Sequence, residues 1–210
     1  MDRIIPGILE KNWTEIEKKI ETARILNKTI HIDIIDGQFS PNQTFLDPKP
    51  FSKYADELFL EAHLMVSNPL KFLEPFAEAG FKRFIGHVEK MENIEEFVAK
   101  GQLLGEVGLA LDIDTEIDFV KINMEDLDCI LLMGTKAGDS GQKLQDKVFE
   151  KISSLSAKTF IPIEIDGGVN DENILKLAEK GAERFVTTSY IFDENPLEAY
   201  KNLLKILESR

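Results

Sequence analysis

Cysteine is almost absent from this chain of 210 residues, which contains only Cys129. A single cysteine cannot form a disulfide within the chain, and a thiolate metal site would need several. Cys129 lies in the apolar segment DCILLM, where a thiol is expected to pack as a small apolar side chain rather than to act as a nucleophile. The sequence therefore argues against a disulfide scaffold and against cysteine chemistry.

Positive charge and long apolar runs are also scarce. Lysine and arginine number 25 against 38 acidic residues, which gives a formal net charge of −13. Such a surface repels nucleic-acid phosphates and anionic membranes, so a phosphorylated ligand would have to be held by local backbone donors. No apolar run reaches the ~18 residues of a spanning helix, and no basic and then apolar leader precedes Ile4. We expect a cytoplasmic protein without a nucleic-acid or membrane partner.

Apolar segments rich in β-branched residues alternate along the chain with segments of helical periodicity. The predicted strands are residues 4–9, 29–34, 58–65, 83–87, 106–111, 129–133, 161–165 and 184–187. Eight strand–helix units in one modest chain predict a (β/α)8 TIM barrel that forms a single domain over residues 1–210. The alternative is an open doubly wound sheet, but its G-x-G-x-x-G signature is absent where the first strand leads into PGILEKNW.

The three histidines, His31, His63 and His87, each follow a short apolar run. In a (β/α)8 barrel the carboxyl ends of the strands form the active-site face, so such residues can converge. The period of two in a strand places His31 and Asp33 on one side, and Asp166 follows another apolar run. Taken alone, each residue is better explained by an interior hydrogen bond. Together, His31, His63 and the two aspartates form a mixed nitrogen and oxygen set suited to Zn²⁺, with Fe²⁺, Co²⁺ and Mn²⁺ as alternatives.

Three motifs resemble those of the ribulose-phosphate 3-epimerase family. The family pattern H-x-D-x-M-D-G-x-F-x-P-N appears here as HIDIIDGQFSPN, the pattern H-[LM]-M as HLM, and D-G-G as DGG. The resemblance extends over nearly the whole chain, from about residue 6 to residue 192. It implies a ribulose-phosphate-binding (β/α)8 barrel in which a divalent metal is held by His31, Asp33, His63 and Asp166.

The resemblance also implies that Asp33 and Asp166 are the acid/base pair of a ketose-phosphate 3-epimerase, with D-ribulose 5-phosphate and D-xylulose 5-phosphate as its substrates. Inversion beside a ketone needs a base on one face of the carbon and an acid on the other, with an ene-diolate between them. The residues that the resemblance places around a phosphorylated ketose are Gly7, His63, Met65, Met133, Gly138, Asp139, Ser140, Gly141, Gly167, Gly168, Thr188 and Ser189.

Several positions depart from the family pattern. Gly7 stands where the motif P-S-I-L has serine, Asp139 enters the phosphate loop M-T-V-x-P-G-F-G-G-Q, and Thr188 replaces the glycine of the G-S after the eighth strand. If position 188 needs a positive φ, threonine there is strained or the loop is rebuilt. Ile35 also replaces a methionine. We expect weakened binding of ribulose 5-phosphate, or a preference for a ketose such as allulose 6-phosphate.

Other functions remain open at this point. Orotidine-phosphate decarboxylase-like and hexulose-phosphate synthase-like barrels share a D-x-K-x-x-D motif, but the lysine position is apolar in HIDIIDGQ. A noncatalytic sugar-phosphate-binding barrel is the other alternative, and retention of both aspartates argues for chemistry. His87 and Glu89 share one face of a strand, where they either support ligands or form a structural pair. The phenylalanine-rich segments are most simply core, and a homo-oligomer is left open.

Overall fold

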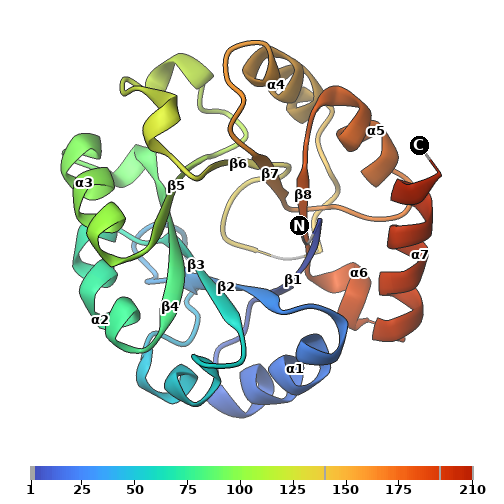
Figure 1. Cartoon of the computed structure of the whole chain (residues 1–210), viewed down its shortest axis with the longest axis horizontal. Coiled ribbons are helices and arrows are strands. Elements are labelled where there is room, and N and C mark those ends of the chain that lie inside the picture. The colour runs from blue at the N-terminus through green and yellow to red at the C-terminus, as the bar shows by residue number, and fades with distance from the viewer. Residues whose placement is uncertain (1–2, 140, 194, 210) are drawn as a thin grey trace.

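The computed structural model describes residues 3–139, 141–193 and 195–209, so Ser140 lies outside the described residues. The strands are β1 (Ile4–Ile8), β2 (Thr29–Ile35), β3 (Phe59–Met65), β4 (Phe81–His87), β5 (Glu106–Leu111), β6 (Cys129–Met133), β7 (Ile163–Asp166) and β8 (Arg184–Thr187). They form a closed parallel barrel in chain order, with β1 paired to β8 (Figure 1). The predicted TIM barrel is confirmed, and the open sheet is wrong.

Helices surround the barrel on the outside (Figure 1). They are α1 (Trp13–Leu26), α2 (Leu73–Glu78), α3 (Ile94–Leu104), α4 (Lys147–Ser156), α5 (Ile174–Lys180), α6 (Ser189–Phe192) and α7 (Pro196–Glu208). Asn12 caps α1 by accepting a hydrogen bond from the backbone N–H of Glu15, and Gly181 ends α5 with a φ of 116°. No helix in the described ranges is long and apolar enough to cross a membrane.

The alternation of strand residues separates two apolar clusters. In β2, the side chains of Ile30, Ile32 and Ile34 join the large core between barrel and helices. Ile35 belongs instead to a smaller cluster inside the barrel, with Met65, Ile85, Ala110, Cys129, Leu131 and Met133. Cys129 is fully buried there, as predicted for a packing residue. The inner face of β2 therefore carries His31 and Asp33 into the barrel interior.

Two strand-to-strand connections lack an α-helix among the described residues. The segment after β2 contains the 3-10 helix η1 (Lys49–Tyr54), and the segment after β5 contains η4 (Ile117–Phe119) and η5 (Met124–Asp126). Pro48 and Pro50 flank the start of η1, and proline disfavours a regular helix in the residues before it. The barrel therefore departs from eight uniform strand–helix units without losing closure.

Candidate active site

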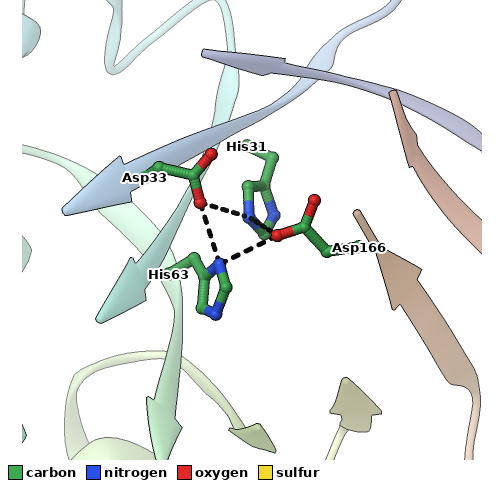
Figure 2. A group of neighbouring side chains, drawn as sticks. All are labelled: His31, Asp33, His63 and Asp166. Carbon is green, nitrogen blue, oxygen red and sulfur yellow. Dashed lines mark hydrogen bonds and ion pairs between the residues drawn. The ribbon is translucent and has the colours of Figure 1, made fainter. Parts of the chain in front are cut away.

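Strand register brings the four predicted metal ligands together. Asp33 on β2 lies opposite His63 on β3, and Asp166 is the last residue of β7. His31 is the third residue of the seven in β2, so it lies deeper in the barrel than the strand end predicted for it. Figure 2 shows all four side chains pointing toward one another. The four side chains predicted to form a cluster therefore lie together, and His31 reaches the cluster from deeper in the barrel.

The spacing of these side chains fits a four-coordinate metal. Nδ1 of His63 lies 2.9 Å from Asp33 and 3.3 Å from Asp166, and Nε2 of His31 lies 3.4 Å and 3.9 Å from the same carboxylates. Tetrahedral ligands ~2.1 Å from a metal lie about 3.4 Å from one another. His31 Nε2 is buried without a hydrogen-bond partner in the described structure. The donor set and its spacing therefore suit a divalent ion.

Burial and close pairing shift the pKa values of these groups in opposite directions. Burial alone would raise the pKa of Asp33, but close contact with and charge attraction from His31 and His63 lower it to about 2. Burial would likewise lower the pKa of His31, yet hydrogen bonds to its carboxylate neighbours raise it well above the usual value. Burial would also lower the pKa of His63, but Asp166 and Asp33 raise it above the usual value. The cluster therefore favours an ionised Asp33.

A row of charged side chains, buried at its inner end, holds the other nitrogen of His31. Its Nδ1 lies 2.6 Å from Oε1 of Glu61, and Oε2 of Glu61 accepts a hydrogen bond from Arg83. Arg83 in turn donates through Nε to Glu106 at 2.9 Å. Register places these residues side by side on β2, β3, β4 and β5. The carboxylate of Glu61 thereby accepts the Nδ1–H of His31 and leaves Nε2 facing Asp33.

This row of charges was not predicted from the sequence, although the spacing of two glutamates indicates that they face the barrel interior. Glu61 precedes His63 by two residues and Glu164 precedes Asp166 by two, so alternation places both on the inner face of their strands. Charged residues inside apolar strands are rarely buried without partners. Glu164 is also fully buried, and its carboxylate lies 3.6 Å from Arg184.

His87 contacts the outer nitrogen of His63, and Glu89 in turn contacts His87. Nε2 of His63 lies 3.0 Å from Nε2 of His87, and Nδ1 of His87 lies 3.0 Å from Glu89. Burial lowers the pKa of His87, which favours its neutral form. A neutral His87 can donate its Nδ1–H to Glu89 and accept the Nε2–H of His63. Nδ1 of His63 then faces Asp33 and Asp166.

A cavity opens above the cluster at the carboxyl ends of the strands. Of the predicted substrate contacts, its lining includes Met65, Met133, Gly138, Asp139, Gly141, Gly167, Gly168, Thr188 and Ser189, together with Asp33 and Asp166. His63 is fully buried beneath this surface and Gly7 lies behind Thr188, so neither lines the cavity. Ile35 fills the apolar wall beside Met65 and Met133.

The loops at this mouth show how the departures from the family pattern are accommodated. Thr188 has a φ of −103°, so this position does not use the positive φ that favours glycine. Gly167 and Gly168 have φ values of 100° and 74°, which threonine or alanine would rarely adopt. The side chain of Lys136 pairs with Asp112 at 3.4 Å, and Asp139 is exposed. A second cavity of about 560 Å³ adjoins the first through residues that include Gly141, Gly168 and Ser189.

Comparison with known proteins connects this site to one family. The model of the ribulose-phosphate 3 epimerase family matches residues 3–192. Ribulose-phosphate 3-epimerase of Chlamydia pneumoniae is 35% identical over 197 residues, which cover 89% of this chain and 85% of that protein. The protein of the same name from Aquifex aeolicus is 31% identical over 215 residues, 99% of this chain and 97% of its own. A cytoplasmic isoform from Oryza sativa subsp. japonica is 32% identical and covers 98% and 94%.

Solved structures with lower sequence identity share the architecture. Phosphoribosyl anthranilate isomerase from Thermus thermophilus superposes with a TM-score of 0.68 at 14% identity, covering 99% of this chain and 98% of that one. Orotidine 5'-phosphate decarboxylase from Pyrococcus horikoshii gives a TM-score of 0.68 at 16% identity, covering 98% and 99%. These likenesses show the barrel fold alone.

Proposed function

The chain belongs to the ribulose-phosphate 3 epimerase family, and from this membership we propose that it interconverts D-ribulose 5-phosphate and D-xylulose 5-phosphate by inversion at C3. The observation that carries the proposal is the placement of Asp33 and Asp166. Their carboxylates come from β2 and β7, line one cavity and share two histidine neighbours. The chain thus presents two proton carriers to one small ligand.

The two carboxylates act in sequence on opposite faces of the substrate carbon. One aspartate, ionised, removes the proton from C3, and the electron pair moves onto the neighbouring carbonyl to give an ene-diolate. The other aspartate, protonated, returns a proton to the opposite face of C3 and becomes ionised. The reverse reaction exchanges their roles, so the two titrations belong to the pair. The low pKa of Asp33 favours it as the group that starts ionised in the cluster without metal.

His31, Asp33, His63 and Asp166 are the residues that would hold the metal. A bound divalent cation supplies Lewis-acid stabilisation of the negative charge that develops on the substrate oxygens. Zn²⁺ suits the two imidazoles and two carboxylates, and Fe²⁺, Co²⁺ and Mn²⁺ accept the same donors. Glu61 and His87 fix the orientation of the two imidazoles from outside.

The wall and the loops of the cavity complete the proposed site. Met65 and Met133 lie in the inner apolar cluster and line the cavity, where their thioethers exclude water from the ene-diolate. The glycine loops around Gly138, Gly141, Gly167 and Gly168 expose backbone to the cavity and would hold the phosphate through N–H groups. The proposal thus assigns the phosphate to the local backbone donors that were expected for an acidic protein.

A second candidate is an epimerase for allulose 6-phosphate. It is favoured by the exposed carboxylate of Asp139 in the phosphate loop and by the adjoining cavity, which extends the space beyond Gly141. A ketose with one more carbon would place its phosphate further out. The chemistry at C3 is the same for both sugars, and only the position of the phosphate contact differs. A cytoplasmic location accompanies either substrate, and a homo-oligomer stays a prediction.

The test measures metal and chemistry together. The protein is purified, stripped with a chelator and reloaded with Zn²⁺, Fe²⁺, Co²⁺ or Mn²⁺, and each form is incubated with ribulose 5-phosphate in D₂O. We expect xylulose 5-phosphate to form with deuterium at C3, and the stripped protein to be nearly inactive. The ratio of kcat/KM for ribulose 5-phosphate and allulose 6-phosphate then assigns the substrate. Binding of both sugars without deuterium incorporation would show a noncatalytic barrel instead.

A further inference from the structure

At the mouth of the barrel, the side chain of Thr188 fills the space that a side chain at position 7 would need. Gly7 lies on β1 beside His31 of β2, and Thr188 directly follows β8 on the other side. A Cβ atom built on Gly7 would lie 2.5 Å from Oγ1 of Thr188 and 2.8 Å from Cγ1 of Val186. These separations are shorter than any normal contact, so a side chain at position 7 and the present side chain of Thr188 exclude each other.

The backbone does not require glycine at position 7. Gly7 is not among the glycines with a positive φ, so other residues could adopt its conformation. What excludes them is the side chains of Thr188, whose hydroxyl lies nearest, and of Val186. This differs from Gly167 and Gly168, whose positive φ values alone favour glycine. The absence of a side chain at position 7 is therefore explained by Val186 on β8 and by Thr188 directly after it.

The hydroxyl of Thr188 is free to contact a ligand. Thr188 lines the same cavity as Asp33 and Asp166. Within the ranges that the structure describes, its hydroxyl forms no hydrogen bond to protein. A threonine hydroxyl can donate one hydrogen bond and accept two. A half-buried hydroxyl without a protein partner, beside two proposed proton carriers, is suited to an oxygen of the bound sugar.

We infer that Thr188, directly after β8, supplies a sugar-binding hydroxyl at the place where the family motif carries serine on β1, and that glycine at position 7 leaves room for it. The inference rests on the proposed function and adds a specificity-determining residue to it. The family pattern pairs serine at position 7 with glycine at position 188, and this chain carries the reciprocal pair. The hydroxyl is thus relocated from one strand to its neighbour, since β1 and β8 are adjacent in the barrel.

The test compares substitutions at positions 188 and 7 in the metal-loaded protein. Thr188→Val keeps the shape of the side chain and removes the hydroxyl, and we expect kcat/KM for ribulose 5-phosphate to fall about 3- to 12-fold, the value of one neutral hydrogen bond. Thr188→Ser should lie closer to wild type than Thr188→Val. The matched control is Thr187→Val, which removes a hydroxyl from the preceding residue of β8, where alternation turns the side chain away from the cavity. Its kcat/KM should be unchanged.

The reciprocal exchange gives the stronger test. Gly7→Ser alone should lower kcat/KM more than tenfold because of the overlap, and Thr188→Gly alone should also lower it. The double variant should be less impaired than the product of these two effects, with Cγ1 of Val186 the remaining close neighbour of position 7. Such non-additivity is expected only for residues that interact. Thermal unfolding and Co²⁺ content of each variant exclude loss of the fold or the metal.

Two outcomes would overturn the inference while the proposed function stands. They are an active wild type whose kcat/KM is unaffected by Thr188→Val, and a double variant as impaired as the product of its single changes. A metal-loaded wild type without epimerase activity would overturn the proposed function and this inference together.

Discussion

The two histidines of the proposed metal site present different nitrogens to the same cluster. His31 offers Nε2 because its Nδ1 is held by Glu61, and His63 offers Nδ1 because its Nε2 meets His87. An imidazole bound to a metal through one nitrogen carries its proton on the other, and the partner of that proton fixes the ring. The nitrogen that each histidine presents is therefore decided by neighbours outside the ligand set.

The first prediction concerns the proton carriers. Asp33→Asn and Asp166→Asn should each reduce epimerisation of ribulose 5-phosphate by about 10²- to 10⁴-fold, because each removes one of two face-specific acid/base groups. Far-ultraviolet circular dichroism should show an unchanged fold. Metal content must be measured for each variant, since both carboxylates are proposed ligands. Near-wild-type turnover by either metal-loaded variant would refute the assignment.

The second prediction concerns metal retention. His31→Ala and His63→Ala should each lose stoichiometric metal during dialysis, because each takes one donor from a site with four. His87→Gln serves as the contrast: it removes an outer partner and should keep one metal per chain with weaker affinity. The measurement is metal content by mass spectrometry after dialysis against buffer without metal. Full tight occupancy in both alanine variants would show that the ligand set is wrong.

Much of the site could be predicted from sequence, because Asp33 and His31 share a strand face by simple alternation and the motifs have fixed spacing. The depth of His31 could not be predicted, since depth depends on where β2 begins in the closed barrel. The steric conflict between a side chain at position 7 and Thr188 could not be predicted from the sequence either. It depends on strands that are adjacent only because the barrel closes.

At the scale of elements, one level of the barrel carries a continuous row of charges across four strands. His31, Glu61, Arg83 and Glu106 follow one another through the registers of β2, β3, β4 and β5. Isolated buried charges are unfavourable, but here the carboxylates flank a guanidinium and an imidazole. A shift of β3 by one residue would turn Glu61 away from His31. The register of the sheet therefore determines the geometry of the site above it.

The third prediction tests this row. Glu61→Ala should weaken metal binding about 10- to 100-fold, because His31 loses the acceptor that orients its ring. It should also lower the free energy of unfolding by about 3 kcal/mol, since Arg83 loses one of its partners. The measurements are competitive metal titration with a chelator dye, the visible spectrum of the Co²⁺ form, and urea unfolding.

The control for the third prediction is Glu57→Ala, which removes an exposed glutamate that pairs with Arg24 near the start of β3. Glu57→Ala should leave both the metal affinity and the Co²⁺ spectrum unchanged. Equal metal affinities in the wild type and Glu61→Ala would contradict the positioning role of Glu61.

A lysine joins α4 to the end of β5. Lys151 is buried, and its ammonium donates hydrogen bonds to the backbone oxygens of Asp112 at 2.7 Å and Ile113 at 3.4 Å. Burial lowers the pKa of Lys151 to about 8, although Glu89 acts in the opposite direction. The charged form is thus disfavoured in the folded state.

The fourth prediction follows from the sign of this shift. Between pH 8 and 10.5 the unfolded chain holds a proton on residue 151 that the folded chain has released, so the free energy of unfolding rises with pH. Over this pH range, the free energy of unfolding of the wild type should rise by on the order of 1 kcal/mol more than that of Lys151→Met, after allowance for solvent screening. Urea unfolding at pH 7.5 and pH 10 measures it. An equal pH dependence in Lys147→Met, an exposed lysine of the same helix, would contradict the assignment to residue 151.

At the scale of the whole molecule, the closed barrel follows from local patterns repeated eight times. Every predicted strand lies within two residues of the observed one at both ends, because continuous apolar runs mark strands buried on two faces. The connections were less predictable. The segment from η4 to η5 lacks an α-helix because short runs of aspartate, asparagine and β-branched residues favour turns over helix. Closure does not depend on which kind of helix covers each strand.

The fifth prediction concerns the stability of the barrel. The proposed ligands come from β2, β3 and β7, so a bound metal would connect strands from both halves of the chain. A ligand at a free concentration 100 times its Kd adds ~2.7 kcal/mol to the free energy of unfolding. For a domain of this size that corresponds to about 5–10 °C in the unfolding midpoint. Calorimetry of the Zn²⁺-loaded and stripped protein should show this difference, and identical midpoints would argue against binding by the folded state.

The overlap between Gly7 and Thr188 also restricts how this barrel could have changed during evolution. Serine at position 7 together with threonine at position 188 would force two side chains into one space. Whichever pair is ancestral, the accessible route between them passes through glycine at both positions. That intermediate avoids the steric conflict between the two side chains but lacks the hydroxyl at the mouth. An evolutionary change from one arrangement to the other would therefore pass through an enzyme with weaker sugar binding. Selection for activity would disfavour the first substitution in either direction.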